Sequence, residues 1–188
     1  MQQFMGELPS PRVSVSRPFL KTGVDYFGPV YIRPAPRRAA VKAYVSVFVC
    51  FCTKAVHLEL VSDLSTDRFL QALQRFISRR GRCSDIYSDN GTNFVGARNK
   101  LGELYRLLRD HTHREKVTSE LAKDGIQWHF NPPSAPHFGG LWEAAVRSTK
   151  NHLIKVIGET PVSAEDFSTL LTQVEACLNS RPFDTDVR

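Results

Sequence analysis

Residues 23–61 read GVDYFGPVYIRPAPRRAAVKAYVSVFVCFCTKAVHLELV, and they contain three runs rich in β-branched and aromatic residues. The runs cover Gly23–Ile32, Val41–Cys52 and Ala55–Val61, and a turn rich in proline and arginine separates the first from the second. Runs of this length and composition are typical of strands that follow one another through short turns. The stretch therefore predicts a three-stranded antiparallel meander whose first strand is interrupted at Gly28-Pro29.

The rest of the chain alternates between helical and strand patterns. Ser65 is a good N-cap for a helix that runs to about Arg80 and stops at Gly81. The further expected elements are a strand at Asp85–Asp89, helices at Phe94–Leu108 and Arg114–Lys123, a strand at Ile126–Phe130, a loop at Asn131–Gly140, a long helix at Leu141–Ile157, and a last helix from a Ser163/Asp166 capping box to about Asn179. This order predicts an α/β fold in which a five-stranded mixed sheet is flanked by helices.

Length and composition set limits on the class of protein. The chain has 188 residues, of which 41% are hydrophobic and 23% are charged, and these values exclude disordered and collagen-like chains. No apolar run approaches the roughly 20 residues that span a bilayer, so we expect no membrane contact. We expect one folded domain over residues 21–182, preceded by an extended arm at 1–20 and followed by a short tail at 183–188.

The charge of the chain is compatible with a polyanionic partner. Lys and Arg number 25 against 19 Asp and Glu, which gives a formal net charge of +6. Arg75 and Arg79 lie together on the far side of the helix that starts after Ser65, and they are candidates for DNA contacts. An exposed basic helix face is more often only solvated. Further candidates of the same kind are Arg33, Arg37, Arg38, Arg80 and Arg82, and binding through such residues weakens steeply with salt.

Three acidic residues stand out by their surroundings. Asp25 lies inside an apolar strand, Asp89 ends the fourth strand, and Glu143 falls in the first turn of the expected long helix. Burial of a lone carboxylate is costly, and several carboxylates brought together repel one another unless they surround a cation. Oxygen ligands suit Mg²⁺ or Mn²⁺. Two such ions, roughly 3.5–4 Å apart, can activate a water or hydroxyl group and stabilise the leaving oxygen of a phosphodiester.

The flank of the long helix supports this interpretation. Glu143, Arg147 and Lys150 follow one another at positions i, i+4 and i+7, so one acid and two cations share a side of the helix. Such a flank can present a metal ligand together with contacts to phosphate. The alternative is a plain surface pair between Glu143 and Arg147, worth about 0.3 kcal/mol.

Four motifs occur in order along the chain: VDYFGP at 24–29, SDNGTNF at 88–94, GGLWE at 139–143 and LNSRP at 178–182. Together they resemble the catalytic core of retroviral and LTR-retrotransposon integrases. The form PSAPHFGGLWE at 133–143 is most similar to the BEL/Pao branch. The resemblance covers about Met5 to Pro182, nearly the whole chain.

The resemblance implies an RNase H-like fold and a DDE integrase, which is a polynucleotidyl transferase and endonuclease. Asp25, Asp89 and Glu143 match the catalytic acids, which bind two Mg²⁺ or Mn²⁺ ions. Integrases trim the 3′ ends of the element DNA with water. They then use each freed 3′-hydroxyl group to attack the target DNA.

The resemblance also implies DNA contacts and partners. Asn90 matches a residue that supports the second acid, and Arg147 and Lys150 match residues that hold the terminal DNA. His137, in the expected loop, is a further candidate for DNA contact, and a hydrogen bond that orders this loop is an equal alternative. The resemblance also implies a homodimer or higher multimer that works on DNA in the nucleus.

Two departures and two alternatives accompany this hypothesis. Asp89 and Glu143 lie further apart in sequence than in retroviral integrases, and we expect the extra residues in the helix before residue 124. The upstream zinc module and the C-terminal domain of integrases have no counterpart in the sequence, so we expect an isolated core. The alternatives are an RNase H-like or resolvase-like nuclease, and a catalytically silent, domesticated module for DNA binding or dimerisation.

Overall fold

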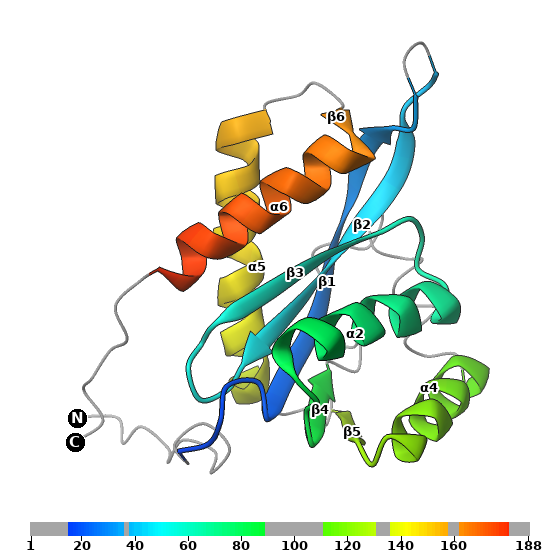
Figure 1. Ribbon diagram of the computed structural model, residues 1–188, viewed down its shortest axis with the longest axis vertical. Coiled ribbons are helices and arrows are strands. Elements are labelled where there is room, and N and C mark those ends of the chain that lie inside the picture. Colours follow the sequence, from blue (N-terminus) through cyan, green and yellow to red (C-terminus); the bar gives the residue numbers. More distant parts are fainter. Residues whose placement is uncertain (1–14, 36–37, 89–110, 131–135, 158–161, 181–188) are drawn as a thin grey trace.

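The structure is a computed structural model that describes residues 15–35, 38–88, 111–130, 136–157 and 162–180. A mixed sheet lies at its centre, with helices on both faces (Figure 1). The strands are β1 (Lys21–Arg33), β2 (Val41–Cys50), β3 (Val56–Val61), β4 (Asp85–Ser88), β5 (Gln127–Phe130) and β6 (Val162–Ser163). The helices are α2 (Thr66–Arg80), α4 (His111–Lys123), α5 (Pro136–Ile157) and α6 (Ala164–Asn179).

The order of strands across the sheet is β3-β2-β1-β4-β5, and the short β6 pairs with β1. The pairs β1–β2 and β2–β3 are antiparallel, which confirms the expected meander, and β4 and β5 join in parallel. The mixed α/β class predicted from the sequence is therefore confirmed. The helix expected at Phe94–Leu108 lies outside the described residues.

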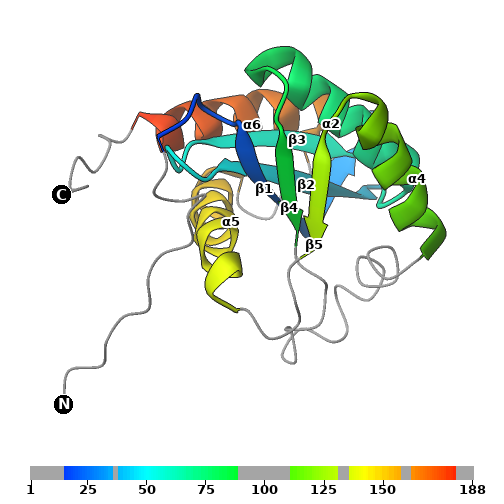
Figure 2. The ribbon, with the colours of Figure 1, turned by 90° about the horizontal axis from the view of Figure 1, so that it is seen from below.

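Two hydrophobic clusters fill the two sides of the sheet. One cluster contains Phe69 and Phe76 of α2 and Val117 of α4. The other contains Val146 of α5 and Phe167 of α6. Figure 2 shows α5 on the opposite side of the sheet from α4. The alternation of side chains along each strand assigns every sheet residue to one of these two sides.

β1 runs through the expected interruption. The register with β2 shifts between Phe27 and Val30, and the Gly28-Pro29 peptide is cis. Gly28 has φ +148°, and a Cβ there would lie 2.8 Å from Cδ1 of Tyr44. The strand therefore contains a bulge, and Gly28 is required at it both for its backbone conformation and for its close contact with β2.

The predicted helix caps are confirmed. The Ser65 side chain accepts a hydrogen bond from the backbone N–H of Arg68, and Gly81 closes α2 with φ +85°. Ser163 accepts from the N–H of Asp166 at 3.0 Å and donates to its carboxylate at 2.6 Å.

Several expected boundaries are wrong. β2 ends at Cys50 rather than Cys52, because the chain turns there and the N–H of Lys54 donates to the carbonyl of Cys50. α5 begins at Pro136, so the predicted loop to Gly140 is too long. Proline fits the first position of a helix because a backbone N–H at that position would have no partner within the helix.

The core extends slightly beyond the expected N-terminal boundary. Phe19 is only 3% exposed and stacks edge-on against Phe76 of α2. It therefore packs with the domain, although residues 1–20 were expected to form an arm. Within the described ranges, no helix is both long and apolar enough to cross a bilayer.

Candidate active site

Asp25 lies in β1 on the side of the sheet that α5 and α6 cover. Its cross-strand partner is Val47, which belongs to the cluster beneath these two helices. Phe27, two residues further along the strand, belongs to the same cluster. Asp25 is half-buried, and its Oδ1 accepts a hydrogen bond of 2.7 Å from the N–H of Tyr26. The carboxylate is thus fixed close to the backbone, in a position that solvent still reaches.

α5 contacts β1 close to Asp25. The ammonium of Lys150 lies 5.6 Å from the centre of the Phe27 ring, and Val146 and Leu153 pack in the same cluster. Figure 1 shows that β1 and α5 run side by side in the same direction. Asp25 comes before Phe27 in β1, and Glu143 comes before Lys150 in α5. Because the two elements run in the same direction, both acids lie on the same side of the contact between Phe27 and Lys150. The structure therefore places Asp25 and Glu143 on neighbouring elements on one face of the sheet.

The flank predicted for α5 is exposed to solvent. Glu143, Arg147 and Lys150 are all exposed, whereas Val146 and Thr149 of the same turns are buried. Because the helix begins at Pro136, Glu143 lies two turns into it, not in its first turn as the sequence suggested. The side chain of His137 lies outside the described residues.

The second predicted acid follows β4. Ser88, the last residue of β4, is the Cα partner of Val24 in the parallel pair with β1. Asp89 and Asn90 come next in the chain and lie outside the described residues. Among the residues that are described, no group of three His, Cys, Asp or Glu side chains is arranged to hold a metal ion. Asp25 and Glu143 are thus the two predicted metal ligands that the structure describes.

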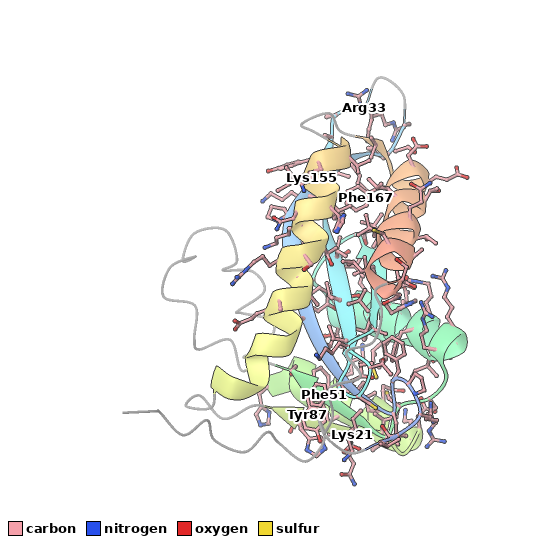
Figure 3. The ribbon with its side chains drawn as sticks, turned by 90° about the vertical axis from the view of Figure 1, so that its left-hand side faces the viewer. Lys21, Arg33, Phe51, Tyr87, Lys155 and Phe167 are labelled. Carbon is pink, nitrogen blue, oxygen red and sulfur yellow. The ribbon has the colours of Figure 1, made fainter. Side chains whose placement is uncertain are left out.

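A second polar cluster on the α5 side of the sheet was not found from the sequence. Asp85 of β4 lies 2.6 Å from Nε2 of His129 in β5, and the His129 ring stacks on Tyr87 at 4.7 Å. Tyr87 in turn stacks on Phe51 (Figure 3). Burial opposes the charge on Asp85, but hydrogen bonds from Ser84 and His129 outweigh it and lower the pKa. The Asp85 carboxylate is therefore already bound by Ser84 and His129 at the start of β4.

Arg75 and Arg79, predicted to contact DNA, bind a carboxylate of the same chain. Nε of Arg75 lies 2.5 Å from one oxygen of Glu59, and Nη1 of Arg79 lies 3.1 Å from the other. Glu59 is only 6% exposed, whereas the two arginine side chains are 40% and 60% exposed. Both guanidinium groups thus neutralise a buried charge while part of each remains at the surface.

The Glu59 pairs belong to a larger group that we call the carboxylate network. It consists of His57, Glu59, Arg75, Arg79, Arg80 and Glu175. His57 is 1% exposed, with Nε2 at 3.0 Å from Glu59 and Nδ1 at 3.3 Å from Glu175. Arg80 also pairs with Glu175, so the network joins α2 and α6 to β3.

The network shifts the protonation of its members. Burial of His57 favours its neutral form, but hydrogen bonds to Glu175 and Glu59 outweigh burial and raise its pKa. Burial also favours the neutral form of Glu59 and of Glu175. Hydrogen bonds from His57 and the positive charge of the arginines outweigh burial and lower the pKa of both carboxyl groups. No local sequence signal indicates this group, because its members come from three separate elements.

Solved structures that are similar to this chain include integrase catalytic cores. The catalytic core domain of BIV integrase matches with a TM-score of 0.54 at 17% identity, over 87% of this chain and 86% of that one. The HTLV-2 integrase catalytic core domain in complex with magnesium, in a dimeric form, matches with a TM-score of 0.53 at 15% identity, over 88% and 89%. The likeness establishes the fold predicted from the sequence, an integrase-type α/β core.

A larger assembly gives a third match. A chain of the simian T-cell lymphotropic virus intasome, in complex with a PP2A regulatory subunit, matches with a TM-score of 0.62 at 16% identity. The match covers 99% of this chain but only 58% of the intasome chain. The present sequence thus spans little more than half of that protein. No protein-family model matches the chain, and a search of curated proteins finds no significant match.

Proposed function

We propose that this chain is the catalytic core of a DDE integrase, which cuts and joins DNA phosphodiesters with divalent metal ions. The observation that carries the proposal is the placement of Asp25 and Glu143 on neighbouring elements of one sheet face, in a fold shared with integrase cores. Asp89 is proposed as the third acid. The BEL/Pao form of the motif supports an LTR retrotransposon as the proposed source.

Strand pairing supports Asp89 as a partner of Asp25. Asp25 follows Val24, Asp89 follows Ser88, and Val24 and Ser88 are paired in adjacent strands. Each aspartate thus comes one residue after a position that is paired between adjacent strands, and this supports Asp89 as the proposed partner of Asp25.

The donor set fits the proposed metal. Three carboxylates are hard oxygen ligands of the kind that Mg²⁺ and Mn²⁺ prefer, and Asp25 is accessible on an otherwise apolar strand. When bound, two such ions activate the attacking water or 3′-hydroxyl group and stabilise the leaving oxygen. The protein itself supplies no covalent nucleophile in this proposal. Its backbone contact at Tyr26 holds the Asp25 carboxylate in a fixed orientation.

The DNA contacts proposed for the site follow the exposed flank of α5. Arg147 and Lys150 face solvent on the same side as Glu143, where they can bind phosphates next to the acids. Asn90 and His137 are proposed at the same site. Arg75 and Arg79 remain proposed contacts of lesser effect, because Glu59 already neutralises part of their charge.

The assembly and location of the protein are part of the proposal. The HTLV-2 core matched above is described in dimeric and trimeric forms, and we propose a homodimer or higher multimer for this chain. Insertion of element DNA into chromosomal DNA implies that the protein works in the nucleus.

The test combines metal binding with DNA joining. Calorimetry with Mn²⁺ should show binding by the wild-type chain and at least tenfold weaker binding by Asp25→Asn and Asp89→Asn. Asp85→Asn is the matched control, because it makes the same change in β4 on a carboxylate held by His129. This variant should bind Mn²⁺ as the wild type does.

A labelled duplex with an element end then distinguishes the possible activities. Joined product that requires Asp25 supports the integrase. Cleavage without joining points to an RNase H-like nuclease. Absence of Mn²⁺ binding by the wild type would overturn the proposal and favour a silent DNA-binding module.

A further inference from the structure

The β1–β2 hairpin ends in a group of exposed side chains that we call the basic hairpin: Tyr31, Arg33, Arg38 and Lys42. Tyr31 is 53% exposed, and the three cations are exposed as well. Figure 1 shows the hairpin extending beyond the end of α2. Figure 3 shows Arg33 at the opposite end of the molecule from Lys21 and Tyr87.

The register of the hairpin explains this exposure. Tyr31 pairs with Lys42 across the ladder, so the two side chains lie on one face. Tyr44, two residues further along β2 on that face, is only 5% exposed and packs in the cluster under α2. The helical cover thus stops between Tyr44 and Lys42. Beyond that point the two-stranded ribbon presents a tyrosine beside a lysine to solvent.

The charge of the hairpin is of one sign. The sequence contains no Asp or Glu between Asp25 and Glu59. None of the ion pairs between described residues includes Arg33, Arg38 or Lys42. Such a group of cations is expected to attract a polyanion.

The acids nearest in the topology belong to α6. Arg33 pairs with Ser163 of β6, and Glu165 and Asp166 follow in the first turn of α6. Asp166 accepts a hydrogen bond from Ser163, and α6 packs on the sheet face opposite to Tyr44. These two carboxylates therefore belong to the other face of the sheet from Tyr31 and Lys42.

We infer that the basic hairpin is a second DNA-binding surface, which holds the sugar-phosphate backbone of a duplex away from the catalytic acids. Arg33, Arg38 and Lys42 bind phosphates, and the Tyr31 hydroxyl donates to a phosphate oxygen. The identity of the polyanion as DNA rests on the proposed function. The surface itself rests on the exposure, register and charge of the hairpin.

The hairpin is separate from the proposed active site. Arg33 lies eight residues beyond Asp25 in β1, which corresponds to about 26 Å of strand. Asp25 lies on the sheet face that α5 and α6 cover, whereas Tyr31 and Lys42 lie on the face of Tyr44, which packs under α2. The basic hairpin is thus a surface distinct from the acids.

The test compares two double variants with the same loss of charge. Arg33→Gln with Lys42→Gln removes two hairpin cations. Lys116→Gln with Lys123→Gln removes two α4 cations that pair with Asp67 and Glu120. Binding of a fluorescent 20-base-pair duplex is measured by anisotropy in EDTA over a range of salt concentrations, with circular dichroism as the check on folding.

The hairpin variant should bind DNA more than tenfold more weakly at about 0.1 M salt, and its salt slope should fall by about 1.8. The α4 variant should retain the wild-type affinity within about twofold, because its cations are already paired. Equal losses in both variants, or none in the hairpin variant, would overturn the inference. So would a hairpin variant that binds DNA normally but loses binding to phosphatidylserine vesicles.

This test separates the inference from the proposed function. The assay contains no metal, so it measures binding of the duplex without the proposed catalytic ions. If the wild-type chain fails to bind Mn²⁺ but shows the hairpin-dependent affinity, the proposed function fails and the DNA-binding surface stands.

Discussion

The carboxylate network and the basic hairpin both place arginines at the surface, yet the arginines have different surroundings. In the network, Arg75, Arg79 and Arg80 all bind carboxylates that lie in or against β3. In the hairpin, Arg33 and Arg38 lie in a stretch of sequence that contains no acid between Asp25 and Glu59. The contrast shows that the number of cations does not define a nucleic-acid surface. The charge across from each cation decides whether it is available to a partner.

The largest expected effect comes from removal of the central carboxylate of the network. Glu59→Gln leaves His57 and two arginines without their shared anion, and removal of one partner of a buried ion pair typically costs about 3 kcal/mol. Urea unfolding measures this loss. Arg33→Gln is the control in the hairpin and should change the unfolding free energy by less than about 0.5 kcal/mol. A loss below about 1 kcal/mol in Glu59→Gln would contradict a stabilising role for the network.

The network should also make the stability of the fold depend on pH. The pKa of His57 is higher in the folded protein than in the unfolded chain, where it is near 6.5. Protonated His57 therefore contributes its full stabilisation of the fold below about pH 6.5. This stabilisation is lost as the pH rises through the folded-state pKa. Arg80, whose Nε lies 3.4 Å from Nδ1 of His57, favours this loss of the proton. The wild-type unfolding free energy should therefore fall as pH rises above about 6.5.

Substitution of His57 tests the source of this dependence. His57→Gln should remove the alkaline decline, and Arg33→Gln should retain it. The lowered pKa values of Glu59 and Glu175 add stability that is present above about pH 4.5 and lost at lower pH, through their folded values. An alkaline decline that persists in His57→Gln would assign it to another group.

A smaller effect distinguishes the two sets of arginines in DNA binding. Arg33→Gln should lower the salt slope of duplex binding by about 0.9, because one phosphate contact is lost. Arg79→Gln should lower it by less, since Glu59 already holds that guanidinium. Anisotropy titrations at several salt concentrations measure both slopes. Equal slopes for the two variants would show that pairing with Glu59 does not reduce the availability of Arg79.

The smallest expected effect belongs to Tyr31. Because the side chain is 53% exposed, Tyr31→Ala should change the unfolding free energy by no more than about 0.5 kcal/mol. DNA binding should weaken without a change in the salt slope, since loss of a hydroxyl group releases no counterion. A change in slope would indicate that the substitution disturbs Arg33 or Lys42.

Elements with local signals could be predicted from the sequence. The Ser65 cap, the Gly81 stop and the Ser163–Asp166 capping box each act over three or four residues, so their positions are correct. The start of α5 could not be predicted in this way. Gly139 and Gly140 disfavour a helix by about 1 kcal/mol each, yet α5 continues through both of them to Pro136.

The candidate site shows the same difference between features that have a local sequence signal and features that depend on packing. Asp25 and Glu143 could be proposed as site residues because a carboxylate in an apolar strand and a charged helix flank are visible in the sequence. The carboxylate network was missed because His57 and Glu175 are joined only when α6 packs against β3. The apolar partner of Lys150, Phe27, was likewise missed, because this contact depends on how α5 lies on β1.

The packing of α6 beside β3 also has a consequence for the outer edge of the sheet. Asn179 accepts from the N–H of Val56 and donates to its carbonyl, each at 2.8 Å, and Glu175 accepts from the N–H of Leu58 at 2.8 Å. Arg75 donates to the carbonyl of Leu60 at 3.2 Å. Side chains thus occupy backbone groups on which an added strand would otherwise pair. Self-association through continuous sheets, and the fibrous aggregates that follow from it, are blocked along this border.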